Sequence, residues 1–170
     1  KKGTIPPMKK ATWLLKNLQQ LKISLKWIVF AALSGTSVGL AGALFHFCLA
    51  GVTRCRADRP WLIWLLPLGG LLIVGTYRLL QQEKDTGTNL VLSSIHSGHR
   101  LPLRMAPLIF LSTLITHLLG GSAGREGAAL QMGGSIGSAI GRQAGFDEKD
   151  RSIMTMCSMS AAFSALFGTP

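Results

Sequence analysis

The sequence predicts an all-α integral membrane protein whose helices are several, tilted and in part interrupted. Charged residues make up 15% and hydrophobic residues 48% of the 170 residues, with a mean hydropathy of +0.35; a soluble domain usually carries about 25% charge. A membrane-spanning helix needs roughly 20 apolar residues. Five stretches contain no Asp, Glu, Lys or Arg: Trp27 to Thr53, Pro60 to Tyr77, Met105 to Gly124, Gly127 to Gly141, and Ser152 to Pro170. The last two are short or rich in glycine, as in transporter helices that end near the membrane midplane.

The positive charge is concentrated before the first span. The formal net charge is +11, and seven lysines precede Asp58, the first acidic residue. Lysines just before a first span predict a cytoplasmic N-terminus. We therefore divide the chain into a cytoplasmic basic segment, residues 1–26, and a membrane domain, residues 27–170. Within the basic segment, Met8 to Ser24 mixes apolar residues with lysines, which is typical of an interfacial amphipathic helix; a solvated basic tail is the alternative.

Neither nucleic-acid binding nor metal binding finds support in the composition. Most Phe and Trp residues lie within the spans rather than among the basic residues, so the stacking platform of a nucleic-acid binder is lacking. His96 and His99 stand close together, but no third or fourth ligand accompanies them, and we expect no metal site. The three cysteines form no CxxC pair, and Cys in an apolar stretch packs as a small hydrophobe.

The first half of the membrane domain contains three expected spans. The first carries Gly35 and Gly39 on one face, which favours close contact with another helix. The second, Trp61 to about Leu80, contains Pro67 and Gly69-Gly70, which are expected to bend it. The third ends at Gly120.

Three shorter elements accompany these spans. Thr88 or Asn89 is expected to cap a short helix from Leu90 to Ser97, because their side chains accept hydrogen bonds from unpaired N–H groups. Another helix begins near Glu126 and repeats glycine at positions 133, 137 and 141, which predicts a very close helix neighbour. The last helix runs toward Phe167 and stops at Gly168-Thr169-Pro170.

Glu126 is the most informative single residue. It is the sole acid between Asp85 and Asp147, and it lies in the glycine-rich run Gly120 to Gly127 between two uncharged stretches. An acid at membrane depth is costly and usually functional. A helix N-terminus offers unpaired N–H groups and roughly half a positive charge, so an anion and the Glu126 carboxylate can compete for the same donors. Protonation then releases the carboxylate, which makes Glu126 a gate and a proton carrier.

The residues alone leave structural interpretations open. An acid in the first turn of a helix is ordinarily a partner of the helix dipole, worth about 0.3–1 kcal/mol. Arg125 is suited to bind carbonyl groups or an acid in a purely structural role. Thr88 and Asn89 are ordinary helix caps, and the glycine run can serve packing alone.

A longer sequence resemblance favours the functional interpretation of Glu126 over the structural ones. The segment from Gly124 to Gly137 reads G-R-E-G-A-A-L-Q-M-G-G-S-I-G and closely resembles the G-R-E-G-P-x-x-Q-x-G-G motif of the CLC chloride channel and anion/proton antiporter family. Gly87-Thr88-Asn89-Leu90-Val91 lies where that family carries its G-S-G-I-P anion-binding motif. The stretch from Ala161 to Pro170 is similar to the helix that ends in the family's F-N-A-P turn. Order and approximate spacing agree along the chain.

The resemblance implies the first half of an inverted-repeat transport domain and a homodimer with a separate pore in each subunit. It implies transport of a monovalent anion, chloride or fluoride, by anion/proton antiport through a bacterial inner (plasma) membrane, without cofactor and without enzymatic activity. Glu126 corresponds to the gate and proton acceptor. The anion-binding residues that it implies are Gly87, Thr88, Asn89, Leu90, Gly124, Arg125 and Gly127. The family's pore tyrosine and internal proton-transfer glutamate are expected beyond this chain.

Two departures from the family pattern bear on selectivity. Ala128 replaces the proline that follows G-R-E-G, and Thr88 or Asn89 replaces the serine of the anion-binding motif. Both changes resemble the bacterial fluoride/proton antiporter branch, and chloride remains open beside fluoride. The alternatives to antiport are a passive chloride channel and a non-transporting membrane assembly subunit. The second alternative leaves Glu126 unexplained.

Overall fold

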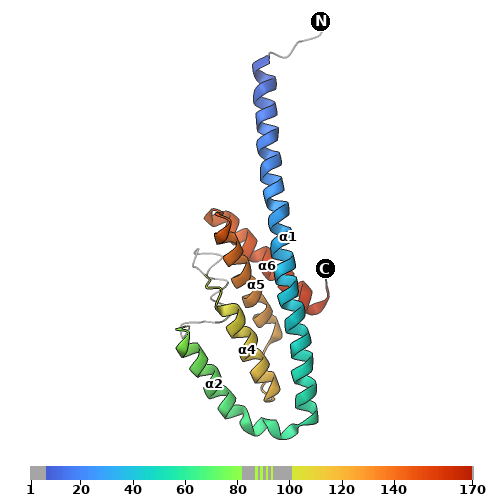
Figure 1. Cartoon of the computed structure of the whole chain (residues 1–170), viewed down its shortest axis with the longest axis vertical. Helices are drawn as coiled ribbons and strands as arrows, with labels where there is room; N and C mark the ends of the chain where they lie inside the picture. The colour runs from blue at the N-terminus through green and yellow to red at the C-terminus, as the bar shows by residue number, and fades with distance from the viewer. Residues whose placement is uncertain are drawn as a thin grey trace. The chain divides into compact units, whose positions relative to one another are not determined.

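The computed structural model describes residues 7–81, 87, 89, 91, 93 and 101–169, with side chains from residue 16 onward. The chain divides into two compact units, Lys1–Leu33 and Ser34–Pro170. Regular structure within the described residues is helical throughout, which confirms the predicted all-α class (Figure 1). The elements are α1 (Pro7–Asp58), the 3-10 helix η1 (Pro60–Leu65), α2 (Leu66–Leu79), α4 (Met105–Leu118), α5 (Arg125–Gln143) and α6 (Glu148–Phe167).

The unit that ends at Leu33 contains the first part of α1. The segment from Met8 to Ser24 is helical, and α1 continues past residue 26 without a break. Lys22 and the apolar Leu21 are both exposed. The helix is thus observed, whereas its place at the membrane surface and the domain boundary at residue 26 stay predictions.

Two described helical segments are long and apolar enough to cross a membrane. They are Lys16–Asp58, with a mean hydropathy of 1.9, and Pro60–Leu79, with a mean hydropathy of 1.6. Met105–Leu118 is apolar but shorter. Large apolar side chains such as Leu40, Phe47 and Trp64 are exposed on these helices, and an exposed apolar surface of this kind is suited to contact with lipid or with further protein.

Within the unit Ser34–Pro170, helices that follow one another pack together. α2 contacts η1 and α4, α4 contacts α5, and the most extensive contact joins α5 and α6. The core places Val38 and Phe45 of α1 in one cluster with Met105 of α4 and Met132 of α5, and the ring centroids of Phe45 and Phe110 lie 5.5 Å apart. This packing fixes α5, which carries Glu126, against α4.

The second predicted span, in which a bend near Pro67 was expected, consists of two consecutive helices. Pro60–Leu65 forms η1, and α2 starts at Leu66 with Pro67 in its first turn, where the missing N–H group of proline has no acceptor to lose. Gly69 and Gly70, in contrast, lie inside the helix. Gly69 is buried against the side chain of Leu119, so its role is close packing of α2 on α4 rather than bending.

The close approach of α1 to its neighbours occurs at a different glycine from the one predicted. No atom among the described residues lies within 4 Å of a Cβ added at Gly35 or Gly39. A Cβ added at Gly42 would stand 2.8 Å from Cβ of Ala165 on α6. The sequence showed the small residues of this helix, but the rotation of α1 decides which of them meets another helix.

The glycine repeat of α5 forms its contact with α6, as predicted. A Cβ added at Gly133 would lie 2.5 Å from the carbonyl oxygen of Ser158 and 2.7 Å from Cβ of Ala162. At Gly137 the added atom would overlap the side chain of Ser158, and at Gly141 it would lie 3.2 Å from Cγ of Arg151. At Gly133 and Gly137 the two helices therefore approach too closely for a side chain, whereas at Gly141 the neighbour is the flexible side chain of Arg151.

α6 is capped at both ends. Asp147 Oδ1 accepts the N–H of Asp150 at 2.8 Å, and Gly168 ends the helix with φ of 66° and donates to the carbonyl of Ser164. This agrees with the predicted stop after Phe167.

Removing the N-terminal cap gives a stability prediction. We expect Asp147→Ala to lower the free energy of unfolding by about 0.5–2 kcal/mol, because one first-turn N–H loses its acceptor. Denaturant titration in detergent measures the change. Asp147→Asn keeps an acceptor and should stay near wild type, so an equal loss in both variants would contradict the capping role.

The predicted short helix from Leu90 to Ser97 falls largely outside the described residues. Asn89, Val91 and Ser93 are helical, and Val91 is fully buried in the core cluster. Asn89 is exposed. These residues support a helix in this region, and the predicted cap at Thr88 stays a prediction.

Candidate functional site

The start of α5 offers backbone donors. The helix begins at Arg125 after the extended residue Gly124 (φ −71°, ψ 122°), and no side chain of the described residues caps it. The first N–H groups of a helix have no acceptor inside the helix, and the helix dipole adds about half a positive charge. Arg125 and Glu126 are exposed and Gly127 is half-buried. The helix end can therefore attract an anion without a buried cation.

A glycine turn leads the chain from α4 to this helix end. Gly121 donates its N–H to the carbonyl of Thr116 at 2.8 Å, and Gly120 has φ of 82°. A Cβ added at Gly120 would lie 2.6 Å from Nε of Arg56, whose guanidinium packs on the turn. The positive φ and the close approach both favour glycine. Gly120 and Gly121 thus fit the tight turn that leads the chain toward Glu126.

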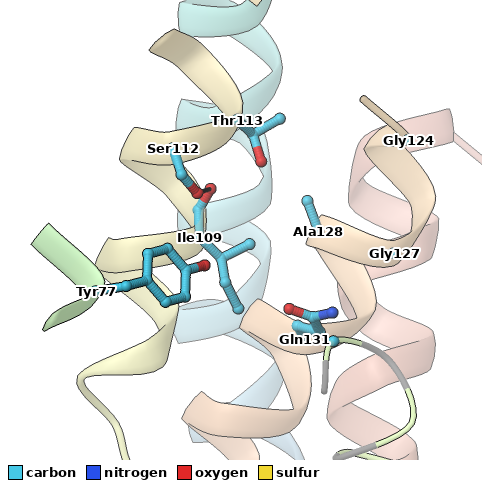
Figure 2. Close-up of a pocket in the computed structure, with 9 residues that line it drawn as sticks. Tyr77, Ile109, Ser112, Thr113, Gly124, Gly127, Ala128 and Gln131 are labelled. Carbon is cyan, nitrogen blue, oxygen red and sulfur yellow. Dashed lines mark hydrogen bonds between the residues drawn. The ribbon is translucent and has the colours of Figure 1, made fainter. Parts of the chain in front are cut away.

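The two predicted anion-binding turns meet at one pocket. The pocket has a volume of about 460 Å³ and is lined by residues of α2, α4 and α5 (Figure 2). Gly87 lines it as well. Gly87 has φ of 66° and is half-buried. The lining residues are Tyr77, Gly87, Ile109, Ser112, Thr113, Gly124, Gly127, Ala128 and Gln131.

The predicted site residues divide into three groups. Gly87, Gly124 and Gly127 line the pocket, although 36 positions separate the first two in the sequence. Arg125, Glu126 and Asn89 are exposed and are not part of the lining. Thr88 and Leu90 lie outside the described residues. The structure therefore brings together the glycine positions of both motifs.

Other pocket residues were not anticipated as site residues from the sequence. Figure 2 shows the side chains of Tyr77, Thr113 and Gln131 around the same space, from α2, α4 and α5. Ser112 Oγ donates to the carbonyl of Ile109 at 3.1 Å, so this hydroxyl is already engaged. Tyr77 is the sole tyrosine of the chain, and Thr113 is a buried hydroxyl in an apolar helix. These two sequence features could have marked Tyr77 and Thr113 as candidate site residues.

Glu126 is the acid that the sequence predicts as the gate of this site. Its neighbour Gly127 lines the pocket, whereas its own side chain is exposed in the first turn of α5. The acids nearest to it in sequence are Asp85 and Asp147. Within the part of the chain that the structure describes, no group of three His, Cys, Asp or Glu residues is placed to hold a metal ion. The pocket is thus lined by the start of α5, and the exposed Glu126 lies next to it in the first turn of that helix.

Comparisons with known proteins agree on one family. Residues 69–170 match the family model described as voltage gated chloride channel. A chloride/fluoride channel protein of Pseudomonas syringae pv. tomato is 38% identical over 156 residues, which cover 91% of this chain and 34% of that relative. An H(+)/Cl(-) exchange transporter of Cronobacter sakazakii is 30% identical over 159 residues, covering 82% of this chain and 34% of the relative.

A solved structure gives the same result for the fold. The crystal structure of a CLC-type fluoride/proton antiporter matches with a TM-score of 0.77 and 32% sequence identity, over 84% of this chain and 36% of that one. The chain thus spans about a third of the length of the relatives it matches.

Proposed function

The chain belongs to the voltage-gated chloride channel (CLC) family, and from this premise we propose that the complete protein exchanges a monovalent anion for protons across a membrane. Proteins of this family are integral membrane proteins, and the described helices form part of its all-α fold. Because this chain is about a third as long as its relatives, the proposal concerns the complete protein.

The observation that carries the proposal is the shared pocket. Gly87 and the pair Gly124 and Gly127 come from separate motifs and line one cavity of about 460 Å³. Glycine at these positions leaves the backbone accessible, and N–H groups at a helix start can replace part of the hydration of an anion. A site of this kind binds anions without a fixed cation in its lining, so the anion can leave again.

Glu126 supplies the coupling in this proposal. It lies in the helix turn whose donors face the anion, so its carboxylate and a halide compete for the same region. Protonation removes the negative charge, the side chain leaves, and an anion enters. Each exchange thereby moves a proton on Glu126 and an anion through the site in alternation.

Fluoride is the anion that we propose first. The relative from Pseudomonas is called a chloride/fluoride channel protein and the matched structure a fluoride/proton antiporter. Ala128 stands where the chloride motif has proline, and Thr88 or Asn89 stands where it has serine. Both replacements resemble the fluoride/proton antiporter branch. Chloride is the second candidate, because the Cronobacter relative is an H(+)/Cl(-) exchanger. A small, strongly hydrated anion needs strong donors to replace its water.

The remaining parts of the proposal concern assembly and location. We propose a homodimer in a bacterial inner membrane, with the lysine-rich N-terminus in the cytoplasm. Transport needs no cofactor in this scheme and involves no enzymatic reaction. The anion and the proton are the transported species.

Flux measurements on the complete protein test the proposal. Liposomes that contain the purified protein should discharge a fluoride gradient faster than a chloride gradient, whereas protein-free liposomes should discharge neither at a comparable rate. An ion-selective electrode follows both anions. Chloride flux equal to or greater than fluoride flux would reject the fluoride assignment, and absence of flux for fluoride, chloride and nitrate would reject anion transport.

A further inference from the structure

Gln131 is a buried polar residue that the gating scheme does not use. It lies on α5 one helical turn after Gly127 and is only 9% exposed. Its neighbours Ala128, Ala129 and Met132 are buried and apolar. A carboxamide is unfavourable in such surroundings unless its N–H and C=O groups are satisfied, whereas methionine fills a similar volume without that requirement. A glutamine here indicates a polar task.

The position of the carboxamide identifies this task. A Cβ added at Gly87 would lie 3.4 Å from Nε2 of Gln131, so the amide lies beside Gly87 with room for little more than a methyl group between them. Figure 2 shows the Gln131 side chain at the edge of the pocket, on the helix that contains Gly127 and that Gly124 precedes. The side chain thus spans from the helix that carries one anion-binding turn to the other turn.

The chemistry of a carboxamide suits such a link. It has two donor hydrogens and an acceptor oxygen, so one side chain can hold both N–H and C=O groups of a turn. Gly87 has φ of 66°, a conformation in which other residues are strained. A contact from a neighbouring side chain helps to hold Gly87 in this conformation at the pocket.

We infer that Gln131 is a positioning residue that fixes the distance between the Gly87 turn and the start of α5, and thereby sets which anion size the pocket prefers. The inference rests on the proposed anion transport. Gln131 acts through the backbone of Gly87 and need not touch the anion. Its loss should change the ratio of fluoride to chloride flux, because two donor sets at an altered separation suit the two ions differently.

The test is Gln131→Met in the complete protein, assayed in liposomes. We expect the fluoride-to-chloride flux ratio to change by about two- to tenfold, the range that one net hydrogen bond supports. A purely structural role would lower the active fraction and reduce both fluxes in proportion, which leaves the ratio unchanged. Gln143→Met is the matched control, since Gln143 ends the same helix and is exposed; its ratio should equal that of wild type.

Each outcome decides between the claims. An unchanged ratio in folded Gln131→Met overturns the inference and leaves anion transport intact. If that variant does not fold, Gln131→Asn, which keeps the amide on a shorter side chain, is measured in the same way, and an unchanged ratio again overturns the inference. A wild-type protein that moves neither anion contradicts the proposed function and the inference with it.

Discussion

Replacing Glu126 by Gln is expected to leave anion flux through the complete protein but to remove its dependence on pH. Glutamine keeps the size of the side chain and cannot ionise, so it mimics the protonated state and no longer competes with the anion. In wild type, the flux should rise as pH falls, because protonation removes the competing carboxylate. Anion efflux from liposomes at a series of pH values measures the difference.

The matched control for this variant is Glu148→Gln. Glu148 is also an exposed acid in the first turn of a helix, α6, but α6, unlike α5, contributes no residue to the pocket lining. If Glu126 were only a dipole partner, both variants would lose about 0.3–1 kcal/mol of stability and keep the pH profile of wild type. A flat profile in Glu126→Gln alone supports the gate; wild-type profiles in both would reject it.

The second large effect is expected at the contact of α5 and α6. Gly137→Ala should lower the free energy of unfolding by about 1–3 kcal/mol, because the new methyl group overlaps the side chain of Ser158 and forces the helices apart. Thermal or denaturant unfolding in detergent measures this loss. The larger Gly137→Leu should reduce the yield of folded protein further.

Gly39→Ala is the control for Gly137→Ala, and we expect it to change stability in the opposite direction. No atom of the described residues lies within 4 Å of a Cβ at Gly39, so the gain in helix propensity, up to about 1 kcal/mol, is not offset by a clash. The two alanine variants should therefore change stability in opposite directions. Destabilisation of similar size in both would contradict the close contact at Gly137.

Much of the fold follows from local patterns in the sequence. Absence of charge marked the spans, and the regular spacing of Gly133, Gly137 and Gly141 predicted a close neighbour for α5. These signals act within one helix and are visible in one segment. The contacts of Gly42 with α6 and of Gly69 with Leu119 were missed, because they depend on helix rotation and on partners distant in the sequence.

In the candidate site, too, some residues could be predicted from local sequence and others depend on packing. The motif positions Gly87, Gly124 and Gly127 were predicted through the resemblance to the CLC motifs, since each motif is a short, continuous stretch of sequence. Tyr77 and Thr113 were not, because each lies on a separate apolar helix and only packing turns it toward the pocket. Gln131 was visible within the motif, but its role depends on contact with Gly87, which the sequence does not reveal.

Proton movement driven by an anion gradient tests the central claim most directly. Liposomes that contain the complete protein and a fluoride gradient are placed in weakly buffered solution, and a pH electrode records proton flow. The account predicts that wild type drives protons uphill against their own gradient and that Glu126→Gln moves fluoride without protons. Wild-type fluoride flux without proton movement, or the same ratio of protons to anions in Glu126→Gln, would contradict it.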